Sequence, residues 1–371
     1  MRKGRRAVLC ALAVSALVPL ARSEESTVSR SHFSVRAELE GRYDDNITYL
    51  SDRDRDRVGD PAFADRYKIE DPGDYVWVPA ARLGWSLNLA KRVTTSMQLE
   101  AKAYRYSANE IKDYETFEIR LAQDLSAARL FQTRLIVDAS ETPDYYLREL
   151  RVAGTTNYES ARFSSREYGV SLEQVLIPKL LDASVHGART RRSYDAPFRE
   201  RSGDLTGYGA DLDLGPPGRL AGFHLAYERS RYDARGDDGS TPVLEPDISS
   251  DRNQLSARAA IRWALGYVTL SGSRELRDYR TDESTDIYHF DREDTRTEYG
   301  LGFHQGLPAG LFLEIALSHE ENGAHLAPGV PESLANDVTD YSENVLSASV
   351  GWRFRSGRSR SGTEGKEEVN P

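Results

Sequence analysis

The chain has 371 residues, a formal net charge of -10 and a mean hydropathy of -0.60. The excess of acidic residues excludes a nucleic-acid partner, because phosphate binding needs a basic surface. After the first twenty or so residues no apolar run reaches the length of a membrane helix, which excludes a helical membrane protein.

Residues 1–23 are predicted to be a signal peptide. An apolar run from Ala7 to Leu20, too short to span a membrane, follows the basic residues Arg2, Lys3, Arg5 and Arg6. Small residues at Ala21 and Ser23 predict cleavage before Glu24, which leaves residues 24–31 as a short periplasmic lead. The single cysteine of the chain lies in the signal peptide, so the mature protein is expected to have no disulfide.

Beyond the lead, apolar and polar residues alternate with a period of two, which predicts strands. Between Phe33 and Tyr43 the odd positions carry Phe, Val, Ala, Leu, Gly and Tyr, and the even positions carry Ser, Arg and Glu. The pattern recurs often enough to predict about fourteen strands, each long enough to cross a bilayer at a tilt. Their ranges are 33–43, 75–89, 93–106, 113–125, 131–140, 162–175, 181–191, 206–214, 221–232, 253–264, 266–278, 294–305, 311–320 and 343–354.

The links between these strands alternate in length. Short links are expected at 90–92, 126–130, 176–180, 215–218, 265 and 306–310, and long polar ones at 44–74, 141–161, 192–205, 233–252, 279–293 and 321–340, with a shorter one on the same side at 107–112. Such alternation is typical of a transmembrane antiparallel up-and-down β-barrel with short periplasmic turns and long extracellular loops, whereas a soluble all-β protein has no reason for it. The barrel is predicted over residues 32–354, followed by a disordered polar periplasmic tail, 355–371.

Charged residues divide between the two faces of the predicted strands. Arg105, Glu115, Arg166, Arg189 and Arg274 would face outward, near the loop-side ends, where they can meet lipid or lipopolysaccharide headgroups. The mid-strand charges would face inward, where they either line a polar path or form a closed network of ion pairs. The proposed pore-lining residues are Arg36, Glu38, Arg42, Arg82, Glu100, Lys102, Arg120, Arg134, Arg258, Arg262, Arg296, Glu298 and Glu314.

Aromatic residues near the strand ends predict two interfacial girdles. The loop-side girdle would contain Tyr43, Tyr75, Tyr208, Tyr227 and Tyr299. The turn-side girdle would contain Trp85, Phe131, Trp263, Phe303 and Trp352.

The last strand, from Leu346 to Phe354, resembles the assembly signal of Gram-negative outer-membrane β-barrels of the porin-like kind. The residues that carry the resemblance are Val350, Gly351, Trp352 and Phe354, and they imply the barrel-assembly machinery as a partner during biogenesis. The tail after Phe354 departs from that pattern. The stretch from Glu40 to Ile47 is similar to the first strand of barrels found with exopolysaccharide export systems and of surface lipoprotein assembly modifiers. Its structural interpretation is a girdle tyrosine followed by a loop entry.

Three classes of function follow. Fourteen strands leave room for a channel for small polar solutes or saccharides, with Tyr104, Tyr106 and Tyr267 able to stack on sugar rings. The alternative is a structural or assembly component of an envelope export machine. A rim-type hydrolase would draw on His289 beside Asp291, or His319 beside Glu320, but no nucleophile stands at a telling spacing, so no catalytic residue is predicted.

No metal site and no cofactor are predicted. The first long link contains alternating acids and bases from Asp52 to Arg57, which lack the glycine and terminal glutamate of a calcium loop and read as a solvated segment. The acidic pair Asp237 and Asp238 gives no stronger signal.

Overall fold

A computed structural model describes residues 31–90, 92–128, 131–152, 155–215, 220–236, 247–263, 265–282, 284, 286, 289–329 and 340–356. The predicted signal peptide, nearly all of the lead, and the tail beyond residue 356 lie outside these residues. The strands are β1 (Ser31–Asp44), β2 (Asp74–Ala90), β3 (Val93–Tyr106), β4 (Tyr114–Ala128), β5 (Phe131–Arg151), β6 (Tyr158–Ile177), β7 (Leu181–Tyr194), β8 (Gly203–Leu214), β9 (Leu220–Ala234), β10 (Ser250–Arg262), β11 (Gly266–Tyr279), β12 (Glu293–Gly306), β13 (Leu311–His325) and β14 (Tyr341–Arg355).

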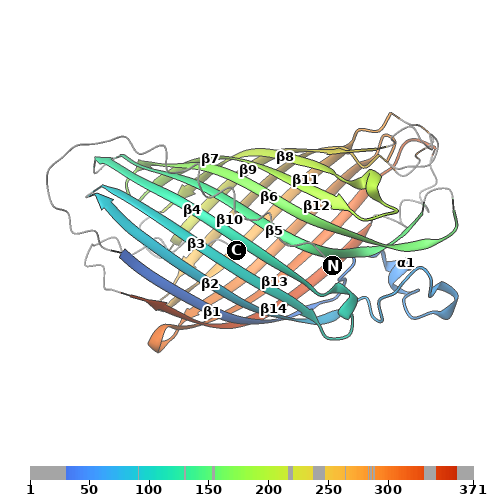
Figure 1. Ribbon diagram of the computed structural model, residues 1–371, viewed down its shortest axis with the longest axis horizontal. Coiled ribbons are helices and arrows are strands. Elements are labelled where there is room, and N and C mark those ends of the chain that lie inside the picture. The colour runs from blue at the N-terminus through green and yellow to red at the C-terminus, as the bar shows by residue number, and fades with distance from the viewer. Residues whose placement is uncertain are drawn as a thin grey trace, which may run out of the picture.

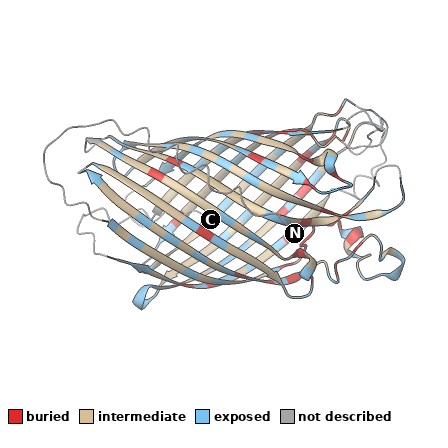
Figure 2. Cartoon of the chain, viewed as in Figure 1, coloured by how far each residue is buried: buried red, intermediate tan, exposed pale blue. Residues whose placement is uncertain are grey.

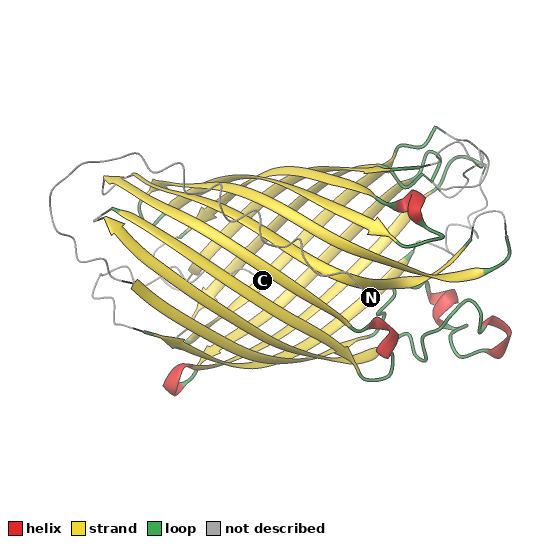
Figure 3. Cartoon of the chain, viewed as in Figure 1, coloured by secondary structure: helices red, strands yellow, loops and turns green. Residues whose placement is uncertain are grey.

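These strands form one closed antiparallel barrel in which each strand pairs with its neighbours in sequence and β14 pairs with β1 (Figures 1 and 3). The predicted fold class and the predicted strands are confirmed. The short helices are α1 (Asp52–Arg55), η2 (Pro61–Phe63), η3 (Glu110–Lys112), η4 (Arg199–Arg201) and η5 (Pro308–Gly310). None of the helices in the described part of the chain is long and apolar enough to cross a membrane.

The longest hairpin differs from the prediction. Residues 141–161 were expected to be a loop, but β5 and β6 continue through most of that range and leave a link at 152–157. The pairing shifts register between Thr142 and Tyr145 and again between Tyr146 and Arg148. These bulges accommodate Pro143, which has no N–H to donate to a ladder.

The outer wall of the barrel is apolar. Leu39 and Leu83, both predicted to face outward, are 46% and 45% exposed, whereas their neighbours Glu38 and Arg82 point inward. Exposed and less exposed residues alternate along the strands in Figure 2. The girdle tyrosines Tyr43, Tyr75, Tyr208, Tyr227 and Tyr299 and the tryptophans Trp85, Trp263 and Trp352 are all exposed, as predicted. Of the two phenylalanines predicted in the turn-side girdle, Phe303 is half-buried, and the side chain of Phe131 lies outside the described part of the structure.

Outward charges form cross-strand ion pairs near the loop-side ends. Arg105 lies 2.5 Å from Glu115, Arg166 lies 2.9 Å from Glu141, and Arg189 lies 3.0 Å from Asp204. Arg274 is also exposed. Charges at this height of the wall are therefore neutralised in pairs, which lowers their cost next to a membrane interface.

Side chains close the seam between β1 and β14 at both ends. On the loop side, Asn46 is fully buried; its amide donates to the carbonyls of Leu50 and Ser342, both at 2.8 Å, and its oxygen accepts from the Leu50 N–H at 2.7 Å. On the turn side, Ser356 exchanges hydrogen bonds with the backbone of Phe33. The Glu40 to Ile47 stretch thus has a structural role at the seam.

The proposed assembly signal alternates between the two faces of β14. Val350, Trp352 and Phe354 are exposed on the outer wall. Gly351 faces inward under the Phe312 ring, where a Cβ would lie 2.1 Å from a ring carbon, so no larger residue fits without displacing the ring. Its role in assembly stays a prediction.

Candidate channel lumen

Every proposed pore-lining residue lies on the inward face of its strand. In the pairing register Arg36 lies between Arg82 and Arg353, and Arg82 lies opposite Glu100. Parity along the strands places the others on the same side. These residues are Arg36, Glu38, Arg42, Arg82, Glu100, Lys102, Arg120, Arg134, Arg258, Arg262, Arg296, Glu298 and Glu314.

Many of these charges pair with each other. Glu100 accepts from Arg82 at 2.6 Å and lies 3.0 Å from Lys102. Arg36 lies 2.7 Å from Glu38 and 3.5 Å from Glu314. Several pairs join residues two apart on one strand, because that spacing puts both side chains on the same face.

The inward wall is not equally accessible along its length. The side chains of Arg82, Lys102 and Glu314 are 38%, 39% and 36% exposed although they point into the barrel, so the lumen has room for water there. Toward the loops, Glu320 and Glu343 are buried. Many buried residues lie at the end that carries α1 (Figure 2). The inward side chains are therefore more accessible in the middle of the barrel than toward the loops.

Two apolar clusters pack the loops against the strands at this end of the barrel. In the first, Ile47, Leu50, Tyr67 and Ile69 of the first loop pack on Tyr146 of β5. The second consists of Ala161, Tyr194 and Phe198 and ties the loop after β7 to β6. Neither cluster follows from the alternation of residues in the sequence.

The Asp52 to Arg57 segment is only partly the solvated loop that was predicted. Ser51 caps α1 by accepting from the Asp54 N–H, and Asp54 is 5% exposed. The reason is Arg66, whose guanidinium donates to both Asp54 carboxylate oxygens at 2.7 and 2.9 Å. Arg66 lies twelve residues after Asp54 and outside the segment. The alternation of charges within the segment therefore could not predict this ion pair.

A row of aromatic side chains crosses the inward wall from β3 to β7. Tyr104 stacks on Tyr114 at 4.2 Å between ring centroids, and contacts at 5.0, 5.1 and 4.9 Å continue through Tyr145 and Phe163 to Tyr194. Of the other tyrosines predicted to stack on sugars, Tyr106 packs against the first-loop cluster and Tyr267 stacks on His304 at 4.7 Å.

The histidines considered for catalysis have other partners than their sequence neighbours. His289 is buried and binds Asp286 at 2.8 Å, where Asp291 was considered. His319 binds Asn344 and Glu321 on the outer wall, whereas Glu320 faces the lumen and binds Arg296. No group of three or more His, Cys, Asp or Glu side chains suited to a metal occurs among the described residues, and Asp237 and Asp238 lie outside them.

Lys112 of η3 is a buried cation at the edge of the first-loop cluster. Its ammonium donates to the Tyr146 carbonyl at 3.3 Å and lies 4.9 Å from the Tyr145 ring centroid. Burial lowers the pKa of Lys112 from 10.5 to about 8. No signal in the sequence distinguished this lysine from a surface residue.

Lys112→Met should change how stability depends on pH. Because the folded chain releases the Lys112 proton at about pH 8 and the unfolded chain at 10.5, the unfolded state holds more protons between these values. The wild type should therefore gain unfolding free energy relative to the variant as pH rises through this window, by roughly 3 kcal/mol at about 1.4 kcal/mol per pH unit. Urea unfolding of both proteins from pH 7 to 11 measures this; parallel curves would contradict it.

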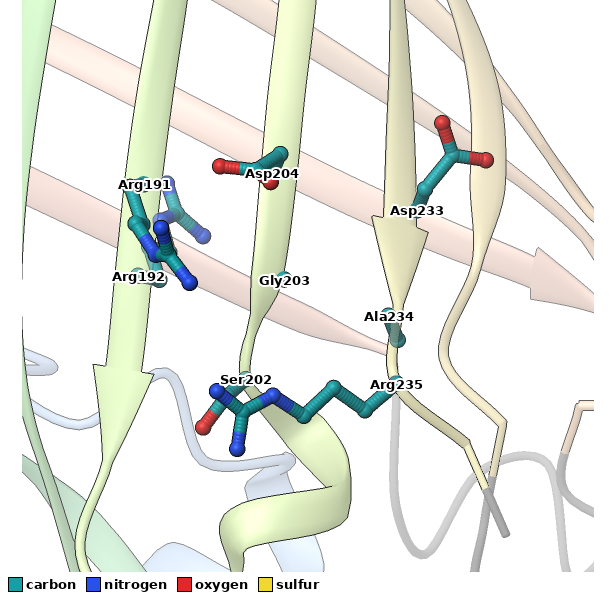
Figure 4. Close-up of a pocket in the computed structure, with 8 residues that line it drawn as sticks. All are labelled: Arg191, Arg192, Ser202, Gly203, Asp204, Asp233, Ala234 and Arg235. Atoms are coloured by element: carbon teal, nitrogen blue, oxygen red, sulfur yellow. The ribbon is translucent and has the colours of Figure 1, made fainter. Parts of the chain in front are cut away.

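Several inward-facing arginines near the loops were missed because they fall in predicted links. Arg148 and Arg192 belong to β5 and β7, and Arg252 lies near the start of β10. The signal was present, since each continues the inward parity of its strand. Figure 4 shows Arg191 and Arg192 near the end of β7, beside a cavity of about 100 Å³ that Asp204, Asp233 and Arg235 also line.

Known proteins give little further guidance. No protein-family model matches the sequence, and no curated protein matches it. Similar solved structures include the TodX monoaromatic hydrocarbon channel deltaS2 mutant (9% identity, 88% of this chain and 90% of that chain, TM-score 0.46) and the Pseudomonas putida toluene transporter TodX (9%, 87% and 89%, 0.41). A Pseudomonas aeruginosa FadL homologue has 10% identity over 87% of this chain and 90% of its own, with a TM-score of 0.40.

Proposed function

We propose that this chain is a channel for small polar solutes in a Gram-negative-type outer membrane, reached by export through the signal peptide. The proposal rests on the contrast in polarity between the outer and the inner side of the barrel wall. The outer side is apolar between two aromatic girdles, which suits lipid, and the inner side holds charged groups that remain accessible to water. The lipid-facing ion pairs near the loops would lie among lipopolysaccharide headgroups.

Conductance in planar bilayers tests the proposal. Purified protein should give discrete current steps. Ala316 is a small, exposed residue on the inward face of β13 beside Gly302 and Ser347, so Ala316→Trp should narrow the lumen and reduce the step size. Its neighbour Leu317 faces outward and is 49% exposed, so Leu317→Trp is the matched control and should leave the steps unchanged. Absence of steps in the wild type would overturn the proposal.

Saccharides are the proposed polar solutes. The exposed part of the Tyr104–Tyr114 stack could accept a sugar ring next to Arg42. An export partner for exopolysaccharide rests only on the Glu40 to Ile47 resemblance, and the seam contacts of Asn46 give that stretch a different reason to exist. Concentration-dependent block of the current by oligosaccharides, weakened by Tyr104→Ala, would support this finer proposal.

A further inference from the structure

Four arginines gather at the loop end of the lumen without acidic partners. They are Arg148, Arg192, Arg201 and Arg252, here named the arginine cluster. Within the part of the chain that the structure describes, none of the four has a carboxylate within ion-pair distance or a hydrogen bond to its guanidinium. All four are partly exposed.

Contacts place the members close together. The Arg192 guanidinium lies 5.7 Å from the Phe163 ring centroid and 5.9 Å from that of Tyr232. The Tyr232 hydroxyl donates to the Arg201 carbonyl. Arg201 of η4 therefore lies next to the same tyrosine that Arg192 approaches. Arg201 is close enough to Arg148, and Arg192 to Arg252, for each pair to interact electrostatically.

Three of the acids around the cluster are bound to other cations, and a fourth, Glu228, interacts electrostatically with Arg252 without lying at ion-pair distance. Glu275 binds Arg277 at 2.6 Å, Asp294 binds Arg292 at 2.7 Å, and Asp54 binds Arg66. The Nε atoms of Arg201 and Arg252 are buried without a hydrogen-bond partner. A buried N–H without an acceptor favours binding of a ligand that supplies one. Carboxylate and phosphate are the ligands that the planar guanidinium group fits best.

The arginine cluster is positively charged, whereas the chain as a whole is negatively charged. A net charge of -10 would by itself favour cations in the lumen. Where basic side chains without acidic partners line a passage, however, they can set its ion selectivity.

We propose that the arginine cluster binds the anionic group of the transported solute, so that the channel prefers small solutes carrying a carboxylate or a phosphate. The inference rests on the proposed channel function and names its substrate class. Binding of an oxyanion would supply acceptors for Arg201 and Arg252 and would offset the mutual repulsion of the four charges.

Reversal potentials across a potassium chloride gradient test the selectivity. The wild type should prefer chloride. Arg192→Gln and Arg252→Gln should each lower the chloride-to-potassium permeability ratio by roughly tenfold, because a unit charge about 6 Å away in a water-filled passage favours chloride by a Boltzmann factor of roughly three and disfavours potassium by the same factor. Arg191→Gln is the matched control, because Arg191 is adjacent in sequence but exposed on the outward face. Preference for potassium in the wild type, or equal effects of Arg191→Gln and Arg192→Gln, would overturn the inference.

Solute block separates the sources of the oxyanion. Glucuronate and inorganic phosphate should each reduce the current, and glucose should not; block by only one of the two assigns the ligand to that class. Equilibrium dialysis with labelled phosphate gives a readout without conduction. If the wild type binds phosphate without conducting and the Arg192→Gln/Arg252→Gln double variant loses that binding, this result would refute the proposed channel function and support the proposed oxyanion site. Absence of both block and binding would refute the site.

Discussion

Leu39→Arg should destabilise the barrel in a bilayer by roughly 2 to 4 kcal/mol, the cost of a cation on the lipid face at mid-depth. Leu39 lies on the outward face of β1 between Phe33 near the turns and Tyr43 near the loops, and it is 46% exposed. Its register neighbours are Val350 and Pro79, neither of which offers a counter-charge. Reversible unfolding in urea from phospholipid vesicles, followed by tryptophan fluorescence, measures the difference.

Tyr43→Arg is the matched control for this prediction. It places the same side chain on the same face of β1, four residues nearer the loops, at the height of the girdle. There the cost should fall to about 0 to 1 kcal/mol. Equal losses at the two positions would show that depth in a membrane does not govern this wall, and the outward face would then not be the lipid face.

The strands and their register follow from the sequence because side-chain direction in a strand has a period of two. A polar residue at Glu38 and an apolar one at Leu39 already assign the two faces, and neighbouring strands must agree with that assignment to close a barrel. Ion pairs such as Arg36 with Glu38 follow from the same period, because both side chains lie on one face. Most of the lumen wall was therefore predictable residue by residue.

The loop end was not predictable in this way. The polar residues 141–161 can form either a loop or a continuation of two strands, provided that bulges accommodate Pro143. Local composition does not distinguish the loop from the continued strands. The burial of Asp54 and Lys112 depends on partners that come from elsewhere in the chain, Arg66 and the tyrosines of β5. The arginine cluster likewise joins four separate elements, β5, β7, η4 and β10. Alternation within one strand contains no information about such contacts.

Asn46→Ala should lower the unfolding free energy by about 3 to 4 kcal/mol, because it leaves the Leu50 N–H and the carbonyls of Leu50 and Ser342 unpaired in a buried site. Asn46→Asp keeps an oxygen that accepts from the Leu50 N–H but loses the N–H groups that donate to the carbonyls of Leu50 and Ser342. It should therefore also lower the unfolding free energy. Asn88→Ala, which removes one partly exposed contact with Thr94 at the other end of β2, should cost less than about 1 kcal/mol. Urea unfolding in vesicles compares the three variants. If Asn46→Ala behaved like Asn88→Ala, the seam would be held by the β1–β14 ladder alone, and the Glu40 to Ile47 stretch would need a functional reason for its sequence in place of a structural one.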